Sequence, residues 1–454
     1  MNISINLIKN QVPDSLPIFK RCYTILMRLF KTLISRILAR SVTTFFLHNP
    51  HIKLVAVVGS VGKTTTKSTL VSVLNSSYKV RTNRGNFNAE FSAPLEILGV
   101  DSPQNPRSVW NWLSVLGRAR QAARRQHNID VVVQEFGIDH PGEMTAFGRY
   151  IRPDVTIVTA IAPEHMEFFG SLETVAREEF ALAEYSEKVI YNRDDIRPEF
   201  VDFADCGQII SYGTEPGADY QMAIGKFTSG KGFQCQLIHA DQTSRPFIIP
   251  VVGVHQLRVA GGAAAVALEL GLDIECVMTM LENFTPVSGR MNILPGINDA
   301  TIIDDSYNSS PLAVKSALTT LYQLPAKTKI AVLGDMNELG QTAADEHAAI
   351  GALCDPKQLD HVITVGRLAE QFLAPVARQT GCTVTSFTKA TDATEFLARL
   401  ANKDTTFLFK GSQGGIYLEE AIKPLLKNPA DRQKLVRQSD AWLEKKRQFF
   451  ESDH

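Results

Sequence analysis

The chain has 454 residues, of which 44% are hydrophobic and 21% are charged, and its formal net charge is −1. This length has room for two or three domains with large buried cores. A net charge near zero excludes a general nucleic-acid-binding protein, because no overall positive field exists to neutralise phosphates. The six cysteines are scattered without a C-x-x-C pair, which is typical of reduced thiols in a cytoplasmic protein and indicates neither a zinc site nor a disulfide framework.

The N-terminal region is basic. No acidic residue occurs between Asp14 and Glu90, whereas twelve Lys or Arg do. Residues 18–40 have the period of an amphipathic helix with one apolar and one basic face. Two interpretations remain open: an interfacial helix on the anionic inner face of a membrane, or, as we prefer, a helix packed on the protein's own body with its basic face in water. The apolar face would contain Tyr23, Leu26, Phe30, Leu33, Ile34 and Ile37.

The most informative segment is Val55-Ala-Val-Val-Gly-Ser-Val-Gly-Lys-Thr-Thr-Thr66. Four apolar residues lead into a glycine turn, and a helical pattern follows. Strand, turn and helix in this order form a phosphate cradle, because backbone N–H groups and the helix N-terminus face the anion. Lys63 would reach the outer phosphates, and the Thr64 hydroxyl would ligate magnesium. Although Val57 stands where a standard P-loop has its first glycine, the context predicts a nucleotide site.

Beyond this segment, β-rich apolar runs alternate with helical patterns, which indicates a doubly wound α/β protein. The predicted strands are Val131–Glu135, Val155–Ala160, Val189–Tyr191, Ile248–Val251, Thr301–Asp304, Lys329–Leu333, His361–Val365 and Thr406–Phe409. The predicted helices are Glu173–Glu184, Ala260–Leu270, Leu312–Leu324 and Thr391–Leu400. Residues 194–241 are interpreted as an insertion within the nucleotide domain. The tail from Asp431 is predicted to be a charged, solvated helix, and Thr285–Gly289 marks a domain boundary.

Two polar residues follow strands of the first series. Glu135 ends the strand Val131–Glu135, a position where a carboxylate can hold a metal beside bound phosphates. His165 follows the next strand. Because magnesium prefers oxygen ligands, a lone histidine at this place is more often structural than a ligand.

Three further motifs lie in the second α/β series, and each is weak by itself. Asp304 and Asp305 stand at the carboxyl end of a strand, where α/β sheets place their ligands. Arg290 lies at the domain junction and suits a nucleotide phosphate or transition-state charge. Lys410-Gly-Ser412 also follows a strand and could recognise an anionic group.

In their order and spacing, these motifs resemble the Mur ligase family over about residues 50 to 430. The segments that carry the resemblance are Gly59-Ser-Val-Gly-Lys-Thr-Thr-Thr-Lys67, Gly85-Asn-Phe-Asn-Ala-Glu90, Glu135-Phe-Gly, Pro141-Gly-Glu143, His165, Phe169-Gly-Ser-Leu-Glu173, Gly289-Arg-Met291, Asp304-Asp-Ser-Tyr-Asn308, Gly334-Asp-Met-Asn-Glu-Leu-Gly340, His347 and Lys410-Gly-Ser412. The resemblance implies an α/β protein with a P-loop-type central nucleotide-binding domain (51–288) and a Rossmann-like C-terminal ligase domain (289–454). The short basic amphipathic helix predicted above precedes them, in residues 1–50.

The resemblance also implies an ATP- and Mg²⁺-dependent ligase that forms an amide bond. The γ-phosphoryl group would pass to a substrate carboxylate, and an amine would attack the resulting acyl phosphate. Charge on the transferring group would be stabilised by positioning and electrostatics, and the C-terminal domain would close on the nucleotide. The implied nucleotide-binding residues are Gly59, Ser60, Val61, Gly62, Lys63, Thr64, Thr65, Arg290, Asp305 and Asn308. The implied metal ligands are Thr64, Glu135, His165 and Glu179; the implied catalytic residues are Lys63, His165, Arg290 and Glu179; and the implied substrate-binding residues are Asn86, Asn88, Lys410 and Ser412.

The chain departs from the family pattern at three places. Only about 50 residues precede the nucleotide strand, so we expect no N-terminal UDP-sugar-binding domain. Many members carry a carbamylated lysine fourteen residues after the histidine, where this chain has Glu179. The adenine segment H-N-x-x-N-A reads His255-Gln-Leu-Arg-Val-Ala260, and Val259 has no side-chain hydrogen-bonding group. Glu179 is interpreted either as a permanent carboxylate at the metal site or as a solvated helix carboxylate.

Several functions therefore stay open. The leading one is a ligase acting on a cell-wall peptide or lipid-linked precursor, in the cytoplasm and in peripheral contact with the membrane through residues 18–40. A second is an amino-acid ligase with a product outside peptidoglycan. A third is a catalytically weak nucleotide-binding scaffold subunit, which the retained Lys63, Glu135 and Arg290 argue against.

Overall fold

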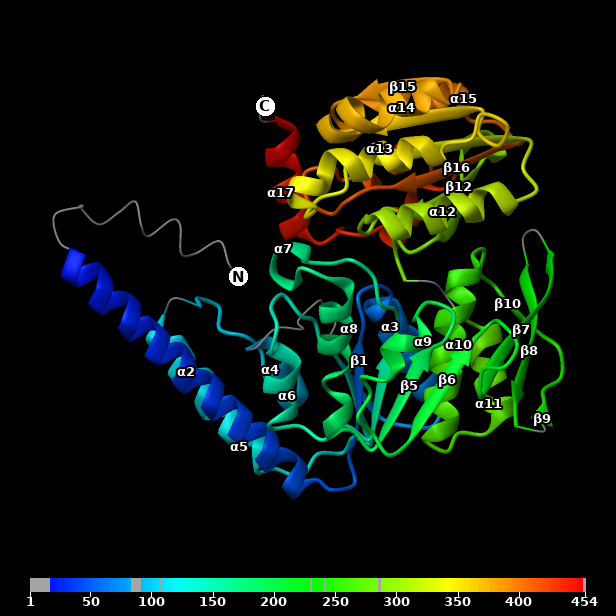
Figure 1. Cartoon of the computed structure of the whole chain (residues 1–454). Helices are drawn as coiled ribbons and strands as arrows, with labels where there is room; N and C mark the ends of the chain where they lie inside the picture. The colour runs from blue at the N-terminus through cyan, green and yellow to red at the C-terminus, as the bar shows by residue number, and fades with distance from the viewer. Residues whose placement is uncertain are drawn as a thin grey trace.

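The computed structural model of the protein describes residues 17–82, 91–106, 108–228, 231–240, 242–284 and 287–451. Two α/β units lie one above the other in Figure 1, and a long N-terminal helix runs along one flank of the lower, middle unit. The predicted substrate residues Asn86 and Asn88 lie outside the described residues. The same is true of the first two residues of the predicted boundary Thr285–Gly289.

The middle unit is built on one sheet, which has ten strands in the described residues. Their order is β10-β8-β7-β6-β5-β4-β1-β3-β2, and β9 pairs with β8. The strands are β1 (Lys53–Val58), β2 (Val80–Thr82), β3 (Val131–Glu135), β4 (Val155–Val158), β5 (Lys188–Asn192), β6 (Ile209–Gly213), β7 (Tyr220–Thr228), β8 (Gly232–His239), β9 (Gln242–Thr243) and β10 (Phe247–Ile249). β1 pairs in parallel with both β3 and β4, which brings the carboxyl ends of these strands to one edge of the sheet.

Helices cover both faces of this sheet. The alternating residues of β1 show it: Leu54, Ala56 and Val58 belong to one buried cluster, whereas Val55 and Val57 belong to another. A central parallel strand buried on both faces reads as a continuous apolar run. The helices of this unit are α2 (Pro17–His48), α3 (Lys63–Leu74), α4 (Ser92–Leu98), α5 (Val109–Ala123), α6 (Glu143–Gly148), α7 (Met166–Phe169), α8 (Leu172–Phe180), α9 (Pro198–Val201), α10 (Val254–Glu269) and α11 (Ile274–Glu282), with a 3₁₀ turn η1 (Ala183–Tyr185).

The long helix α2 packs on the protein's own body, as preferred from the sequence, over the part whose side chains are described. Ile34, Leu38, Val42 and Phe45 recur at helical spacing and are buried in the same cluster as residues of α4 and α5. Among the predicted apolar positions whose side chains are described, Leu33 was wrong, because it is 55% exposed. No helix in the described residues is long and apolar enough to cross a membrane.

The C-terminal unit has a sheet of six strands in the described residues, in the order β11-β12-β16-β13-β14-β15. Only the β11–β12 pair is antiparallel. The strands are β11 (Asn292–Pro295), β12 (Thr301–Asp305), β13 (Thr328–Gly334), β14 (His361–Val365), β15 (Val384–Phe387) and β16 (Thr405–Lys410). The helices are α12 (Pro311–Gln323), α13 (Ala343–Leu353), α14 (Ala374–Gln379), α15 (Thr394–Leu400), α16 (Glu419–Ile422) and α17 (Asp440–Glu451). Short turns are η2 (Ile297–Asp299), η3 (Gly340–Thr342), η4 (Ala369–Leu373, a π-helix), η5 (Ala390–Ala393), η6 (Lys423–Leu425) and η7 (Pro429–Lys434).

The two units meet at the N-terminal end of α10. The Gln256 side-chain amide donates to the Arg290 carbonyl oxygen at 3.1 Å, and Val252 is buried in a core cluster of the C-terminal unit. The segment 194–241 contributes β6, β7 and β8, so it extends the main sheet. The tail was predicted to be solvated, which is wrong for one face of α17, because Lys446 is 2% exposed and binds Glu419 and Glu420.

Candidate active site

The turn between β1 and α3 has the backbone shape of a phosphate-binding loop. Gly59 and Gly62 have φ values of 119° and 91°, which a residue with a Cβ adopts only with strain. A Cβ on Gly59 would lie 2.4 Å from the Thr159 Oγ1 and 2.9 Å from the Thr159 nitrogen. Glycine is therefore required at position 59 by both backbone conformation and space.

The end of β4 holds this turn in place. The Thr159 hydroxyl donates to the Val61 carbonyl at 2.7 Å, and the Ser60 N–H donates to the Ala160 carbonyl at 2.8 Å. The Ala162 N–H in turn donates to the Ser60 hydroxyl at 3.1 Å. The turn is thus preorganised by neighbouring strand residues that the sequence patterns did not mark.

Lys63 is the first residue of α3, and its ammonium group folds back over the turn. It donates to the Gly59 carbonyl and lies 3.8 Å from a Glu164 carboxylate oxygen. Burial lowers the pKa of Lys63, but the carboxylates of Glu164, Glu179 and Glu135 outweigh burial, so the pKa is raised above its ordinary value. The site therefore holds a permanent positive charge at the place where Lys63 was predicted to meet phosphate.

Thr64 and Glu135 place two oxygen atoms that could bind a metal ion beside the turn. The Thr64 hydroxyl donates to Glu135 Oε1 at 3.2 Å. Glu135 is 3% exposed, and its Oε2 lies 3.3 Å from the Lys67 ammonium but accepts no hydrogen bond of good geometry. A hydroxyl and a carboxylate oxygen with spare lone pairs are the ligands that Mg²⁺ prefers, and this ion usually takes only one or two carboxylates beside phosphates and water.

Glu179 lies inside the site and not on a solvated helix face, which contradicts the second interpretation of this residue. It is fully buried, and its Oε2 accepts the Gly59 N–H at 2.7 Å. Its Oε1 and the Oε1 of Glu164 both lack a hydrogen-bond donor. Burial first, and then the neighbouring Glu164, raise the pKa of Glu179 well above its ordinary value, although Lys63 opposes this.

His165 is placed by a strained backbone. Its φ of 45° puts it in the left-handed region, which non-glycine residues seldom adopt outside special sites. Its Nε2 lies 3.5 Å from an Asp139 carboxylate oxygen. Within the described residues, no three His, Cys, Asp or Glu side chains form a group that could hold a metal. The four predicted metal ligands are thus not assembled as one cluster.

The C-terminal unit contributes an arginine and an acid–base pair. The Arg290 guanidinium lies 4.2 Å above the Tyr307 ring, and its buried Nε has no hydrogen-bond partner. Asp305 pairs with the Lys410 ammonium at 2.9 Å, which also donates to the Asn308 carbonyl at 2.6 Å. Burial lowers the pKa of Lys410, although Asp305 opposes this.

Lys410 and Ser412 were predicted to meet the incoming amino compound. Both are almost fully buried, and the Ser412 hydroxyl accepts the Asn337 N–H at 2.8 Å. In this structure they hold the carboxyl ends of β12, β13 and β16 together. Contact with a substrate remains a prediction for both residues.

The segment that departs from the adenine motif still makes a polar network. The Arg258 side chain donates to Asp194 at 3.1 Å and to Asp195 at 2.7 Å. The Asn192 amide links Asp195 to the Thr159 carbonyl, at 2.7 and 2.9 Å. Polar groups of β5 and the loop after it thus reach the edge of the P-loop turn. The signal in the sequence was a short polar run after the predicted strand Val189–Tyr191.

A second network, from the tail, supports the Asp305 loop. Arg437 donates to the carbonyl oxygens of Ser306 and Tyr307 at 2.8 and 3.0 Å. Glu419, which is fully buried, binds Arg437 at 2.6 Å and Lys446 at 3.3 Å. Neither Glu419 nor Arg437 belongs to a motif, so this support could not be predicted from the sequence.

Family models match both units. The Mur ligase middle domain matches residues 57–267, and the Mur ligase glutamate ligase domain matches residues 289–413. The chain belongs to the Mur ligase family. It is an ATP-dependent ligase that forms amide bonds, as the resemblance implied, and the P-loop-type middle unit with a C-terminal ligase unit is confirmed.

Among curated relatives, the UDP-N-acetylmuramoyl-tripeptide–D-alanyl-D-alanine ligase of Bacillus subtilis is 29% identical over 384 residues, which cover 83% of this chain and 76% of the relative. The Escherichia coli ligase of the same name is 24% identical over 83% of this chain and 77% of its own length. Among solved structures, MurF from Acinetobacter baumannii superposes with a TM-score of 0.70 at 25% identity, covering 88% of this chain and 80% of that one. MurF from Thermotoga maritima, solved in complex with ADP, has a TM-score of 0.69 at 22% identity, covers 88% and 84% of the two chains, and supports the fold.

The family uses ATP and Mg²⁺, and the residues of this site fit the ion in part. Thr64 and Glu135 offer two adjacent oxygen donors, one of them with an unused lone pair. His165 and Glu179 point to other partners, Asp139 and the Gly59 N–H. When bound, Mg²⁺ would neutralise charge on the phosphates.

Proposed function

We propose that this enzyme activates a carboxylate of a cell-wall peptide as an acyl phosphate and joins it to an amino compound, as the D-alanyl-D-alanine ligases to which it is similar are named for doing. The observation that carries the proposal is the preorganised turn at Gly59, with Lys63 charged above it and Thr64 and Glu135 beside it. A kinase-like or hydrolytic enzyme needs no second α/β unit, whereas a ligase must bring a second substrate to the acyl phosphate.

Each side chain has a distinct part in this proposal. Lys63 stabilises the charge that develops on the γ-phosphoryl oxygens, because it is fixed and positive before the nucleotide arrives. Thr64 and Glu135 hold Mg²⁺. Arg290 reaches the nucleotide from the C-terminal unit, and its unpaired buried Nε is a donor without a partner in the free protein.

Asp305 and Asn308 belong to the same wall of the site. Asp305 is nearly buried in its pair with Lys410, so its approach to a nucleotide requires the C-terminal unit to move toward the turn. We propose the domain limits 51–288 and 289–454 for these two bodies, with 1–50 as the N-terminal helical region. Glu179 stands where the family's carbamylated lysine would be; its Oε2 accepts the Gly59 N–H, and its Oε1, which has no hydrogen-bond donor, is available to the metal site.

The carboxylate substrate is proposed to be a peptidoglycan peptide, either attached to UDP-N-acetylmuramic acid or linked to a lipid. The lipid-linked form places the enzyme in the cytoplasm and in peripheral contact with the inner face of the membrane through residues 18–40. An amino-acid ligase outside peptidoglycan is the second candidate, because no described residue identifies the amine.

ADP release tests the reaction. The enzyme is incubated with ATP, Mg²⁺ and either UDP-N-acetylmuramoyl tripeptide or a lipid-linked muropeptide, with and without D-alanyl-D-alanine. ADP that forms only with both organic substrates, together with a new amide product seen by mass spectrometry, supports the proposal. Tight ATP binding without turnover on any pair, including pairs from a cell extract, would instead identify a scaffold subunit.

A further inference from the structure

Helices α2 and α5 lie side by side and run in the same direction. At their carboxyl ends, the Asn49 amide donates to the Arg125 carbonyl at 3.0 Å and the Gln126 amide donates to the His48 carbonyl at 2.7 Å. Closer to the amino end of each helix, side chains from residues 37–44 of α2 and 120–124 of α5 line a common hollow. The two helices therefore form one rigid, two-helix surface on the flank of the middle unit (Figure 1).

Each helix has a stripe of residues along this surface at alternating spacings of three and four, which places them on one helical face. In α5 the stripe consists of Trp110, Leu113, Gly117, Arg120 and Arg124, and in α2 it consists of Leu33, Ile37, Arg40, Thr44 and Leu47. Trp110 is 80% exposed, and Leu113 and Leu47 are also exposed. Large apolar side chains are thus open to solvent on both helices.

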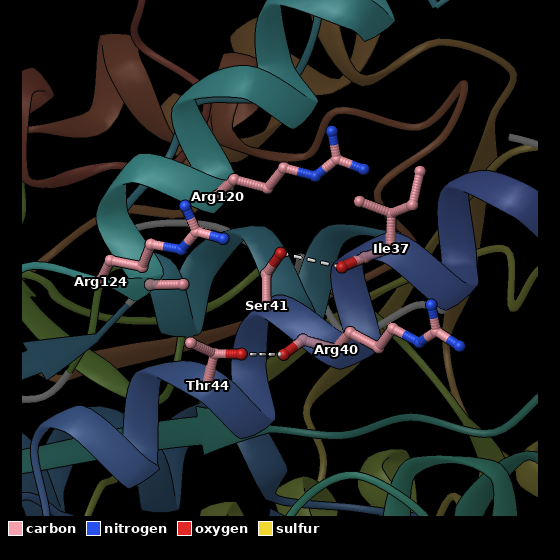
Figure 2. A pocket seen from close by; sticks show the side chains of 7 residues that line it. Ile37, Arg40, Ser41, Thr44, Arg120 and Arg124 are labelled. Carbon is pink, nitrogen blue, oxygen red and sulfur yellow. Dashed lines mark hydrogen bonds between the residues drawn. The ribbon is translucent and has the colours of Figure 1, made fainter.

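Arginines occupy the middle and the carboxyl end of the same surface. Figure 2 shows Arg40 from α2 and Arg120 and Arg124 from α5 around one hollow, whose volume is about 150 Å³. The hydroxyls of Ser41 and Thr44 that line it donate to backbone carbonyls of their own helix.

Neither helix of this surface carries an acidic residue. The sequence has no Asp or Glu from residue 15 to residue 89 or from residue 102 to residue 129. Among the described ion pairs, none involves Arg40, Arg120 or Arg124. Three guanidinium groups are therefore free to bind an anionic partner on a surface that also exposes tryptophan and leucine.

We propose that the α2–α5 surface, defined by these two stripes, docks the enzyme on an anionic lipid bilayer, with Arg40, Arg120 and Arg124 binding headgroup phosphates and Trp110, Leu113 and Leu33 entering the interface. The inference rests on the membrane contact proposed above and extends it from residues 18–40 to a two-helix face that includes α5. Tryptophan is favoured at the membrane interface, and arginines favour anionic headgroups. A protein interface usually has an apolar centre surrounded by a polar rim. On this surface, in contrast, apolar residues and arginines follow one another along the length of each helix.

The position of the surface is compatible with turnover. In Figure 1, α2 and α5 lie on the flank of the middle unit, not between it and the C-terminal unit. Docking through this flank would leave the opening between the units accessible to a substrate that is itself linked to the lipid.

The test is binding of the full chain to vesicles of neutral phosphatidylcholine with and without 30% phosphatidylglycerol. Each basic residue near an anionic membrane contributes roughly 1 kcal/mol, which corresponds to about fivefold in the partition coefficient. Removal of three arginines should therefore lower the partition coefficient on anionic vesicles about 100-fold. The variant carries Arg40→Gln, Arg120→Gln and Arg124→Gln. The matched control carries Lys226→Gln, Lys357→Gln and Lys403→Gln, which remove the same charge from exposed positions on other elements.

Tryptophan emission gives an independent measurement, because Trp110 is exposed whereas Trp112 is buried and Trp442 is half-buried. Anionic vesicles should shift the emission of the parent protein to shorter wavelength, and Trp110→Phe should abolish the shift. Equal binding of parent and arginine variant, or equal loss in the lysine control, would overturn the proposal. The proposal would also be overturned if the parent protein formed a dimer in solution and bound no vesicles, and the arginine variant were a monomer. ADP release with water-soluble substrates is measured in parallel; it should be unchanged in the arginine variant, so failure of docking and failure of the ligase function are separate results.

Discussion

Gly59→Ala tests whether the turn after β1 needs its tight geometry. The native φ of 119° costs a residue with a Cβ roughly 1–3 kcal/mol. The new methyl group would also overlap the Thr159 hydroxyl and backbone nitrogen, and overpacking of this kind costs typically about 1–3 kcal/mol. With both the backbone strain and the overlap, the substitution should lower the free energy of unfolding by about 2–6 kcal/mol. If the turn moves to escape the overlap, the Gly59 N–H leaves Glu179 and ATP affinity falls at least tenfold.

Gly142→Ala is the matched control for this substitution. Gly142 has a φ of 93°, and a Cβ there would meet nothing within 4 Å, so only the backbone term applies. Urea denaturation followed by circular dichroism compares the two variants with the parent, and calorimetric titration measures ATP binding. If Gly59→Ala loses no more stability than Gly142→Ala and keeps its affinity for ATP, the packing argument for this turn is wrong.

Three other substitutions give distinct results. Lys63→Met should reduce ADP release by roughly 10²–10³-fold, the loss expected when a preorganised charge is removed, with an unchanged circular dichroism spectrum; undiminished turnover would exclude its role. Burial raises the pKa of Asp304 from 3.8 to about 6, so its contribution to stability is complete below pH 4 and is lost as the pH rises through 6. The free energy of unfolding of Asp304→Asn, relative to that of the parent, should therefore rise by up to about 3 kcal/mol between pH 4 and pH 7. If the difference between the two proteins in urea denaturation stays constant over this range, the raised pKa of Asp304 is contradicted. Glu419→Gln should cost about 3 kcal/mol, because a buried ion pair with Arg437 is broken, whereas the exposed Glu444→Gln should leave the urea midpoint unchanged; equal midpoints for both variants would refute this.

The core of the fold was predictable because its strands are buried on both faces. The runs at 131–135 and 361–365 are continuous and apolar, and their predicted bounds agree with β3 and β14. Strands β6 to β9 were not among the predicted strands, and β7 to β9 lie toward the edge of the sheet. There, parts of the strands are open to solvent, and exposed residues interrupt the apolar pattern of β7 and β8. The alternation of apolar and polar residues that predicts a strand is therefore weak.

The candidate site was predictable where a short segment contains both its geometry and its chemistry. Glycine at position 59, lysine at 63 and threonine at 64 are such a case, because strand, turn and helix are contiguous. Glu179 was located by its spacing from His165, but its bond to the Gly59 N–H spans 120 residues and has no local pattern. The same reason hid Thr159, whose hydroxyl supports the turn from a neighbouring strand.

The tail network leads to a conclusion about how the C-terminal unit works. The family match to this unit ends at residue 413, yet Arg437 and Lys446 lie beyond it and bind Glu419. Arg437 also binds the carbonyl oxygens that directly follow Asp305. Because a loop held by charged hydrogen bonds loses little entropy on binding its ligand, the tail is expected to set the position of Asp305 before the nucleotide arrives. The tail, which lies beyond the family match, is thus expected to set the wall that must close on the P-loop turn.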